Sequence, residues 1–338
     1  MNVLIVGSNF FGYSDKIIES MESDYGANVD FISHIPPGDY FWSFLSKKIP
    51  GFFCFYSFIY SVYLLLLLRL RNKKYDKCII ILGRIINSSF YDGLRKIQPN
   101  IEIVMYQWDS IKNYNAVESI VTMVDRFITF DKNDFHRLTL KHVDRKVKII
   151  HLPLFYIDEY CYNGEAVDID IAFLGALHTD RYSIYESFLK NSIFLNKNVK
   201  SKFFVKNFNN FKSYENKNSV KLDESIITFQ SMSSLYISDI FKRAKFVIDV
   251  HNEYQSGLTM RTFEALASGA KLITTNDAIK GYPFYNESVV FVFDRNNIDF
   301  DGIKRFISSD NVVSREAISE SVSAYKLREW VGSVLYGY

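Results

Sequence analysis

The residues best suited to binding chemistry lie around Gly257, in the second half of the chain. The apolar run Phe246–Val250 leads into a polar loop, then Gly257, then a predicted helix that carries Arg261 and Glu264. The start of a helix offers N–H groups and the positive end of its dipole to a diphosphate, and glycine lets a ligand approach the backbone. The Arg261 guanidinium can grip phosphate oxygens, and the Glu264 carboxylate, about one turn further along, can accept both hydroxyls of a ribose.

The same segment also fits an ordinary strand–loop–helix unit that binds nothing. Arg261 and Glu264 are three residues apart, so on a helix they can form a surface ion pair. Units of this kind with a single glycine are common, and the spacing taken alone slightly favours this simpler interpretation.

A longer match around this segment favours ligand binding. Residues 257–269, GLTMRTFEALASG, and 271–276, KLITTN, resemble the donor-binding segment of GT-B-fold glycosyltransferases, most closely a bacterial group that assembles lipopolysaccharide and capsule. In that superfamily the glutamate before an Ala-x-Gly turn holds the nucleotide ribose, and Glu264 matches its position. The resemblance implies that the following residues hold a nucleotide-sugar donor: Gly257, Leu258, Thr259, Arg261 and Glu264.

The family pattern is broken at one position. Retaining members of the best-known branch carry a second glutamate eight residues before the first, where this chain has Ser256. That glutamate contacts the donor sugar, so Glu253, three residues upstream of Ser256, is the candidate to replace it. The catalytic residues that follow from this interpretation are Arg261, Glu253 and, in the N-terminal half, Asp109.

A second match lies in residues 171–182, IAFLGALHTDRY. It resembles the first strand and loop of the C-terminal domain in the same enzymes. The resemblance implies that Gly175 lets the donor approach the backbone, that Arg181 reaches the diphosphate and that His178 adds to the donor site. In a chain without this function, the segment would be a simple turn with a solvated Arg181 and an exposed His178.

The acceptor side is predicted in the N-terminal half. Gly7, Ser8 and Asn9 follow the first strand but lack the dinucleotide fingerprint, and the resemblance implies that their loop faces the acceptor. Asp109 follows the strand Ile101–Tyr106, where a carboxylate can bind acceptor hydroxyls or act as a general base. The alternative role for Asp109 is to cap the helix that follows.

Alternating strands and helices must position all of these residues. The expected strands are Asn2–Val6, Val29–Ile32, Lys77–Leu82, Ile101–Tyr106, Arg126–Phe130 and Lys148–Leu152, then Asp170–Leu174, Lys202–Val205, Ile226–Phe229, Phe246–Val250, Lys271–Thr275 and Val289–Phe293. Two successive alternations predict an α/β protein of two Rossmann-like domains that face each other across a cleft, the GT-B fold. Ligands of such sheets bind at the carboxyl ends of the strands.

The domain limits follow from length and composition. A chain of 338 residues is long enough for two domains, and the polar stretch Ile157–Asp168 is the predicted linker. We expect an acceptor-binding domain over 1–156, a donor-binding domain over 169–314, and a helical tail over 315–338 that packs back on the N-terminal domain.

One segment, residues 51–74, is unusually apolar. Gly51–Leu68 contains almost no polar side chains, and Arg69, Arg71, Lys73 and Lys74 follow at once. Its length is at the lower limit for a membrane span, but a span would cut the first domain in half. We expect a helix that is partly buried and partly applied to a membrane surface, with the basic residues toward anionic headgroups. A fully buried helix fits the sequence equally well.

Composition excludes several other classes of function. A net charge of +2 does not predict nucleic-acid binding. The three cysteines are too far apart for a metal site or a disulfide framework, and Cys54 and Cys78 lie in apolar runs where we expect buried thiols. The start of the chain does not resemble a signal peptide, so we expect a cytoplasmic protein, at the inner face of the cell membrane where it meets lipid.

These observations together predict a glycosyltransferase that moves a sugar from a nucleotide-sugar to a lipid-linked or polysaccharide acceptor. The convincing loops hold no Asp-x-Asp motif, so we expect no metal and no cofactor besides the donor substrate. Two alternatives remain open, namely a nucleotide-sugar epimerase of related fold and a non-catalytic binding protein that keeps the fold.

Overall fold

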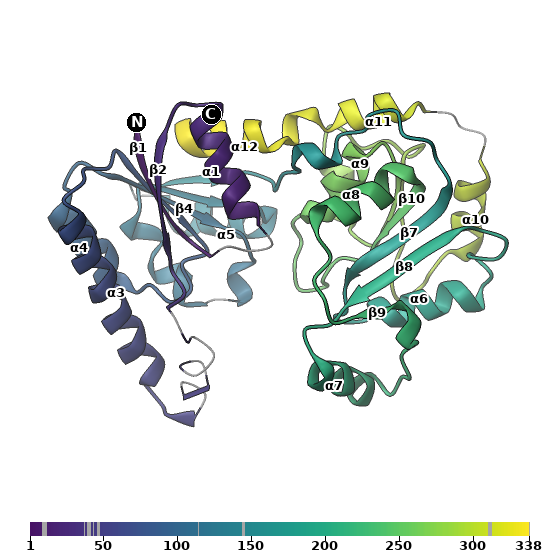
Figure 1. The fold of residues 1–338 in the computed structure, drawn as a ribbon, viewed down its shortest axis with the longest axis horizontal. Helices are drawn as coiled ribbons and strands as arrows, with labels where there is room; N and C mark the ends of the chain where they lie inside the picture. The colour runs from purple at the N-terminus through teal and green to yellow at the C-terminus, as the bar shows by residue number, and fades with distance from the viewer. Residues whose placement is uncertain are drawn as a thin grey trace. The chain divides into compact units, whose positions relative to one another are not determined.

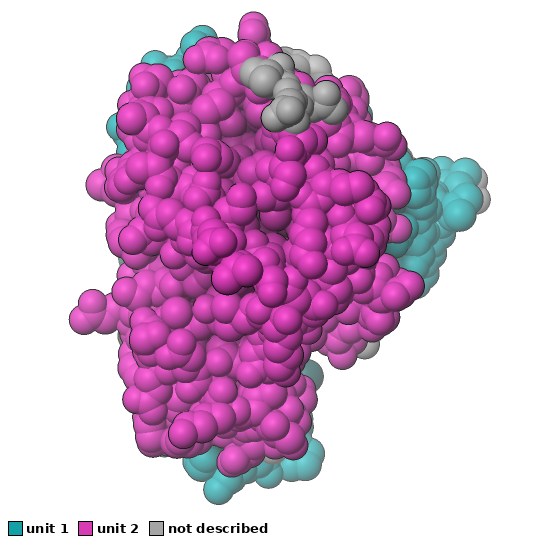
Figure 2. Space-filling view, turned by 90° about the vertical axis from the view of Figure 1, so that its right-hand side faces the viewer, with its two compact units in different colours: residues 1–153, 328–338 teal, residues 154–327 magenta. Residues whose placement is uncertain are grey.

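The computed structural model describes residues 1–338 except 9–11, 37, 39–41, 43, 46–47, 114, 144–145, 310–312 and 338. It contains two compact units, which are coloured separately in Figure 2. Unit 1 comprises Met1–Pro153 and Arg328–Tyr338, and unit 2 comprises Leu154–Leu327. Each unit is built on one six-stranded parallel sheet with helices between the strands (Figure 1), which confirms the predicted class of two Rossmann-like domains.

The sheet of unit 1 has the order β2-β1-β3-β4-β5-β6, with every neighbouring pair parallel. Its strands are β1 (Asn2–Gly7), β2 (Asn28–Ser33), β3 (Lys77–Ile81), β4 (Glu102–Gln107), β5 (Arg126–Thr129) and β6 (Lys148–His151). Its helices are α1 (Tyr13–Ser23), α3 (Phe52–Arg71), α4 (Ser88–Ile97), α5 (Lys132–Lys141) and α12 (Leu327–Tyr336), with the 3-10 turns η1 (Ile111–Asn113), η2 (Asn115–Ser119) and η3 (Val121–Met123). The strand order reverses between β1 and β3.

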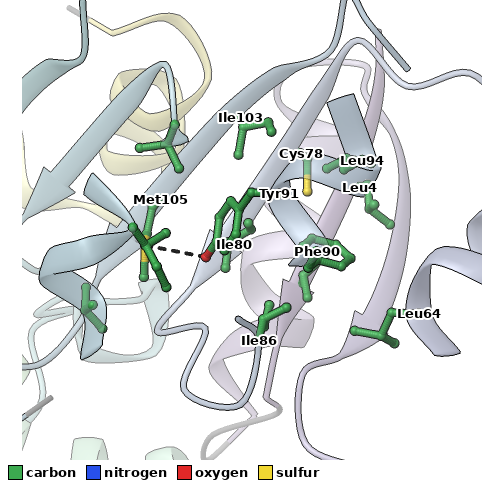
Figure 3. Packing of buried hydrophobic residues seen from close by; sticks show 14 of the residues in the cluster. Leu4, Leu64, Cys78, Ile80, Ile86, Phe90, Tyr91, Leu94, Ile103 and Met105 are labelled. Carbon is green, nitrogen blue, oxygen red and sulfur yellow. Dashed lines mark hydrogen bonds between the residues drawn. The ribbon is translucent and has the colours of Figure 1, made fainter. Parts of the chain in front are cut away.

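The core of unit 1 forms where α3 and α4 cover one face of this sheet. Side chains of β1, β3 and β4 meet those of α4 in the cluster of Figure 3, where the Tyr91 hydroxyl lies 3.9 Å from Sδ of Met105. Parallel strands covered on both faces need nearly continuous apolar sequence. The run Val3–Val6 provides it, and this is why the strands could be predicted to within one or two residues.

The sheet of unit 2 has the order β12-β11-β10-β7-β8-β9, again all parallel. Its strands are β7 (Ile169–Ala176), β8 (Val199–Phe204), β9 (Ile227–Thr228), β10 (Ala244–Asp249), β11 (Lys271–Thr274) and β12 (Val290–Val292). Its helices are α6 (Arg181–Lys190), α7 (Phe208–Asn218), α8 (Ser234–Arg243), α9 (Met260–Ala267), α10 (Phe300–Ser308) and α11 (Arg315–Ser321), with the 3-10 turns η4 (Asp158–Tyr160), η5 (Glu224–Ile226), η6 (Asp277–Gly281) and η7 (Ser323–Tyr325).

This strand order is the one that dinucleotide-binding Rossmann folds use. The chain starts in the middle of the sheet at β7, adds β8 and β9 on one side, and then returns to add β10, β11 and β12 on the other. The reversal therefore lies between β7 and β10. Ligands of open α/β sheets bind at such a switch point, outside the carboxyl ends of the two strands.

The segment predicted as a linker, Ile157–Asp168, is part of unit 2. Tyr160 is buried in η4 and its carbonyl accepts from the Ser268 hydroxyl, while the backbone N–H of Tyr162 donates to the carbonyl of Ala267. The segment looks polar in sequence because only Ile157 and Tyr160 are buried. The two units divide a few residues earlier, between Pro153 and Leu154.

The predicted C-terminal tail is shared between the units. In α11, the Ser319 hydroxyl donates to the carbonyl of Ala267 in unit 2. In α12, Trp330 is buried against Tyr106 of β4, with ring centroids 4.8 Å apart. Arg126 fixes the end of the chain, since it donates to the carbonyl of Leu335 at 3.1 Å and pairs with Glu102. Residues 328–338 therefore complete unit 1.

Candidate functional site

Arg181 lies at the switch point of unit 2. It is the first residue of α6, and its guanidinium donates to the carbonyl of Ala176 at the end of β7 and to the carbonyl of Val250 just after β10. The side chain is 8% exposed, and its Nε has no hydrogen-bond partner. Burial lowers the pKa of Arg181 to about 10, so it stays a cation at neutral pH.

This cation has no ion-pair partner among the residues that the structure describes. The nearest negative charges that stabilise it are Asp249 and Asp180, which act at a distance rather than as ion pairs. A buried cation that bonds only to carbonyl dipoles is costly unless a ligand supplies the opposite charge. The sequence analysis proposed Arg181 for the diphosphate, and its placement gives it the burial and the charge for that role.

Gly175 serves Arg181 directly. A Cβ atom at this position of β7 would collide with the Arg181 guanidinium. The glycine was expected to let a donor approach the backbone, but the space beside its Cα is filled by the arginine. Its small size therefore admits the cation to the switch point.

A second arginine, Arg295, lies beside this position. It follows β12, pairs with Asp180 through Nη1 at 3.0 Å, and donates through Nη2 to the carbonyl of His251 at 2.8 Å. His251 in turn bonds through Nδ1 to the Thr275 hydroxyl at 2.7 Å. These contacts join the loops after β10, β11 and β12 to the start of α6, so the loops around the switch point form one hydrogen-bonded network.

His178 belongs to the same cationic cluster. Burial, followed by the nearby charges of Arg181 and Arg295, lowers its pKa to about 3. The imidazole is therefore neutral at physiological pH, with Nδ1 3.2 Å from the Thr179 hydroxyl. It is half-buried rather than exposed, and the charges that depress its pKa mark a local field suited to an anion.

The helix α9 starts two residues later than the sequence predicted, at Met260. Its N-cap is Thr259, whose hydroxyl lies 3.4 Å from the Asp249 carboxylate and makes no capping bond to the helix. Thr262 also donates to Asp249, at 3.0 Å, which ties the first turn of α9 to the end of β10. The first turn thus lies at the carboxyl edge of the sheet, close to the switch point.

Arg261 and Glu264 form an ion pair on α9, with 3.1 Å between Nη1 and Oε2. The pair that the simpler interpretation expected is present, but it is not a surface pair, because Glu264 is only 2% exposed. Arg261 also stacks on Phe241, with Cζ 5.2 Å from the ring centroid. A buried carboxylate paired with a partly accessible arginine is compatible with both ribose binding and a purely structural role.

The remaining predicted donor residues have different surroundings. Gly257 is buried and its carbonyl accepts from the Asn276 amide at 3.2 Å. Leu258 is fully buried and anchors the loop, while Glu253 lies in an exposed turn. A surface carboxylate in a loop can reach a donor sugar only from the solvent side, so the geometry gives Glu253 no preorganised role.

The acceptor-side residues lie at the carboxyl edge of unit 1. Gly7 ends β1 and its carbonyl accepts from the His34 N–H at 2.8 Å; the carbonyl of Ser8 accepts from Ser14. Asn9 lies outside the described residues. Asp109 follows β4, where it forms an ion pair with Arg84 at 3.4 Å.

Asp134 of α5 caps the turn that follows Asp109. The N–H of Ile111, which begins η1, donates to Asp134 of α5 at 2.8 Å, and the Ser110 hydroxyl donates to the same carboxylate. Asp109 itself accepts from the N–H of Ser110. With the capping role taken by Asp134, the position of Asp109 at the strand end leaves the functional interpretation in place.

Sequence analysis missed three side chains at these two edges. Arg295 carries the same signal as the predicted residues, because it is a basic residue just beyond a strand. His34 and Gln107, at the ends of β2 and β4, are buried, and none of their side-chain nitrogen or oxygen atoms has a hydrogen-bond partner. An isolated histidine or glutamine gives no such signal in sequence, since only the structure reveals that its polar atoms lack partners.

The comparisons with known proteins rest on structure. No family model and no curated protein matches the chain. The lipopolysaccharide outer core galactosyltransferase WaaB matches with a TM-score of 0.60 at 11% identity, over 100% of this chain and 99% of that chain. Anabaena HepE in complex with UDP and glucose matches with 0.61 at 10%, over 100% and 99%. The UDP-GlcNAc 2-epimerase of Methanocaldococcus jannaschii matches with 0.55 at 12%, over the whole of both chains.

Two six-stranded parallel sheets and full-length similarity to these proteins define a GT-B fold. Solved proteins of this fold include both a lipopolysaccharide galactosyltransferase and UDP-GlcNAc 2-epimerases. At sequence identities of 8–12%, the structural similarity establishes the fold alone, and the activity has to be inferred from the residues of the site.

Proposed function

We propose that the chain is a glycosyltransferase that moves a sugar from a nucleotide-sugar donor to a lipid-linked or polysaccharide acceptor in cell-surface glycan synthesis. The observation that carries the proposal is the buried Arg181 at the switch point of unit 2, in a cluster that includes Arg295 and Arg261. A nucleoside diphosphate supplies a negative charge for Arg181, since Arg295 and Arg261 are already paired with Asp180 and Glu264. The neighbours point to uridine nucleotides first, because the solved structures of Anabaena HepE and Staphylococcus aureus MnaA contain UDP.

The charged and polar side chains of the predicted donor site each take a defined part in this proposal. Arg181 and the first turn of α9 bind the diphosphate, and Arg261 reaches it from the same turn. Glu264 accepts the ribose hydroxyls, and a neutral His178 donates or accepts a single hydrogen bond. These groups are set in place before the reaction, so they act mainly by positioning and by stabilising charge.

In the transfer step, an acceptor hydroxyl forms a bond to the anomeric carbon while the bond from that carbon to the donor phosphate oxygen breaks. The diphosphate leaves with the bonding electron pair, and the cations of unit 2 stabilise its charge. The acceptor proton passes to a base, for which Asp109 is the candidate. Within the described residues, no three His, Cys, Asp or Glu side chains form a metal site, and chemistry without a metal or cofactor stays a prediction.

The place of action is also part of the proposal. A lipid-linked acceptor requires an enzyme that works at the inner face of a cell membrane, and the apolar-basic segment 51–74 supports such contact. The other class of partner, nucleic acid, has no support in a net charge of +2.

An epimerase is the second candidate, because UDP-GlcNAc 2-epimerases match the whole chain. The reaction products distinguish a transferase from an epimerase. A transferase yields a glycoside and the nucleoside diphosphate, whereas the epimerase would release nucleotide and sugar without forming a glycoside. A non-catalytic binding protein would give no product with any donor and weak nucleotide binding or none.

Thermal shift against UDP, GDP, CMP and their sugars tests the donor site. A ligand at one hundred times its Kd stabilises the protein by about 2.7 kcal/mol. We expect one nucleotide to raise Tm and the Glu264→Gln variant to lose that rise, while Glu224→Gln, an exposed site of the same unit, keeps it. Absence of a shift with every nucleotide would contradict the proposal.

A further inference from the structure

The helix α3 has one face inside unit 1 and another face that the described residues leave uncovered. Its inner residues recur every three or four positions, and its uncovered face is formed by large apolar side chains. The inner set is Tyr56, Ser57, Tyr60, Ser61, Leu64 and Leu68. The uncovered set is Phe53, Phe55, Phe58, Ile59, Val62, Tyr63, Leu66 and Leu70, of which Phe55 is 60% and Leu70 is 81% exposed. We call the second set the apolar face of α3.

The inner face is held by specific bonds. The Tyr60 hydroxyl donates to the carbonyl of Ser33 at 2.7 Å, and the Ser57 hydroxyl donates to the carbonyl of Ile85 at 2.6 Å. Leu65 packs on Gly93 of α4, where any larger residue would collide with it, and the two helices lie side by side in Figure 1. A helix that crossed a bilayer would lose these bonds, so α3 is fixed with its apolar face outward.

This exposure corrects one sequence-based expectation. Cys54, expected to be a buried thiol because its neighbours are apolar, is exposed. Within the described residues, α3 is long and apolar enough to cross a membrane. Only a third of its most apolar 18-residue stretch is buried, whereas the core helix of a soluble protein is mostly buried. The apolar composition of α3 is therefore not explained by the core of its own unit.

Charge at the end of the helix indicates what covers this face. Residues 52–74 contain no Asp or Glu, and Arg69, Arg71 and Lys74 are exposed. Lys73, which was also expected to face headgroups, is instead paired with Asp30 at 2.9 Å. Aromatic and aliphatic side chains beside three exposed basic residues match the acyl boundary and the anionic headgroups of a lipid surface.

We propose that the apolar face of α3 docks on an anionic phospholipid surface, with the helix lying in the plane of the interface and Arg69, Arg71 and Lys74 on the headgroups. A second copy of the chain would also cover apolar side chains, but its own helix would offer no acidic partner to the basic residues, since residues 52–74 contain no Asp or Glu. The proposal concerns unit 1 alone and does not depend on the donor site.

Vesicle flotation tests the proposal with vesicles of phosphatidylglycerol mixed with phosphatidylcholine, and of phosphatidylcholine alone. We expect the full chain to bind the anionic vesicles at least tenfold more tightly, and 0.5 M salt to weaken binding. Leu66→Glu should lower binding at least tenfold. The matched control is Leu140→Glu, which places the same charge at an exposed leucine of α5 in the same unit.

The contribution of the basic residues to vesicle binding is tested with a separate pair of triple variants. Arg69→Ser, Arg71→Ser and Lys74→Ser together should reduce binding to anionic vesicles to the level seen with phosphatidylcholine. The same three-charge change at the exposed Lys190, Lys197 and Lys217 of unit 2 should leave it unchanged.

Three results would overturn the proposal. They are wild-type protein that binds neither vesicle, a Leu66→Glu variant that binds like wild type, and a lipid-free dimer that Leu66→Glu converts to a monomer. The third result would assign the face to a second copy. Tryptophan fluorescence of Leu66→Glu that matches wild type shows that unit 1 of the variant is folded, because Trp42, Trp108 and Trp330 belong to unit 1. A retained nucleotide-induced Tm rise separates failure of this proposal from failure of the donor site.

Discussion

Arg261 and Glu264 form an ion pair within one turn of α9, with 3.1 Å between the guanidinium Nη1 and the carboxylate Oε2. The carboxylate is almost completely buried, whereas about a fifth of the arginine side chain is exposed. Without its cation, Glu264 would be a buried charge in the interior of unit 2. The ion pair therefore gives Glu264 a cationic partner at the place where the proposed function requires an acceptor for ribose hydroxyls.

The energy of this pair can be measured with a double-mutant cycle. Arg261→Met should lower the free energy of unfolding by about 2 kcal/mol, because it leaves Glu264 buried without a partner. Adding Glu264→Gln should recover part of that loss, so the coupling between the two sites should exceed about 1 kcal/mol. Urea unfolding followed by circular dichroism measures it. Strictly additive effects would mean that the pair contributes nothing to the fold.

The position of Arg181 requires a guanidinium, because two of its nitrogens donate in different directions, to the carbonyls of Ala176 and Val250. Lysine has a single ammonium and cannot reproduce the two fixed directions. Arg181→Lys should therefore weaken binding of UDP at least tenfold while changing the affinity for uridine little, since uridine lacks the diphosphate. Isothermal titration compares the two ligands, and an equal loss for both would remove Arg181 from the diphosphate site.

Two glycines at the end of a first strand offer a matched comparison. At Gly175 an added Cβ meets the Arg181 guanidinium, but at Gly7 the nearest atom to an added Cβ is 3.6 Å away, which is ordinary contact. Gly175→Ala should displace the arginine, destabilise unit 2 by about 1–3 kcal/mol and weaken UDP binding like Arg181→Lys. Gly7→Ala should change neither quantity. If Gly175→Ala bound UDP normally, the arginine position would be irrelevant to the donor.

The central strands were predictable because parallel strands that are buried on both faces demand continuous apolar runs such as Val3–Val6. The strand β8, which is partly exposed and reads VKSKFF, begins three residues before its predicted start at Lys202. The helices α5 and α7 are hard to recognise in the sequence because they are largely polar and expose most of their residues. Their N-caps, Asp131 and Asn207, are the signals that sequence analysis could have used. Tyr160 was placed in a linker because two buried side chains, Ile157 and Tyr160, are too few to give a polar stretch a recognisable period.

Site residues were predictable where they lie in a short sequence segment with a recognisable pattern. Arg181 and Glu264 stand in segments whose order of strand, loop and helix is visible in sequence. What sequence could not supply is the pairing of distant segments. Arg295 reaches Asp180 and His251 only because β12 and β10 end at the same edge. Likewise, the apolar composition of α3 does not reveal which of its faces the sheet covers.

The buried His34 should make the stability of unit 1 depend on pH. Burial, and to a lesser degree the charge of Arg84, lowers the pKa of His34 from 6.5 to about 4. Above pH 6.5 the ring is neutral in both states. As pH falls from 6.5 toward 4, the unfolded chain takes up a proton that the folded chain does not, so the free energy of unfolding decreases, by about 2 kcal/mol at pH 5.

Tryptophan fluorescence during urea unfolding measures this effect, because Trp42, Trp108 and Trp330 all belong to unit 1. Between pH 6.5 and pH 5, His34→Gln should reduce the slope of the free energy of unfolding against pH by the equivalent of about one proton. His136→Gln, at an exposed position of α5, serves as the control and should keep the wild-type slope. A wild-type slope in His34→Gln would assign the pH dependence to other groups.

The last eleven residues, 328–338, should stabilise strands that precede them by about two hundred positions. Trp330 packs on Tyr106 of β4, and Arg126 at the start of β5 donates to the carbonyl of Leu335. Trp330→Ala removes a large buried ring and should lower the stability of unit 1 by about 3–5 kcal/mol. Hydrogen exchange should then speed up in β4 and β5 and stay unchanged in β7 and β10. Faster exchange confined to unit 2 would show that the tail belongs to the other unit, and its contacts with Tyr106 and Arg126 would not be what holds it.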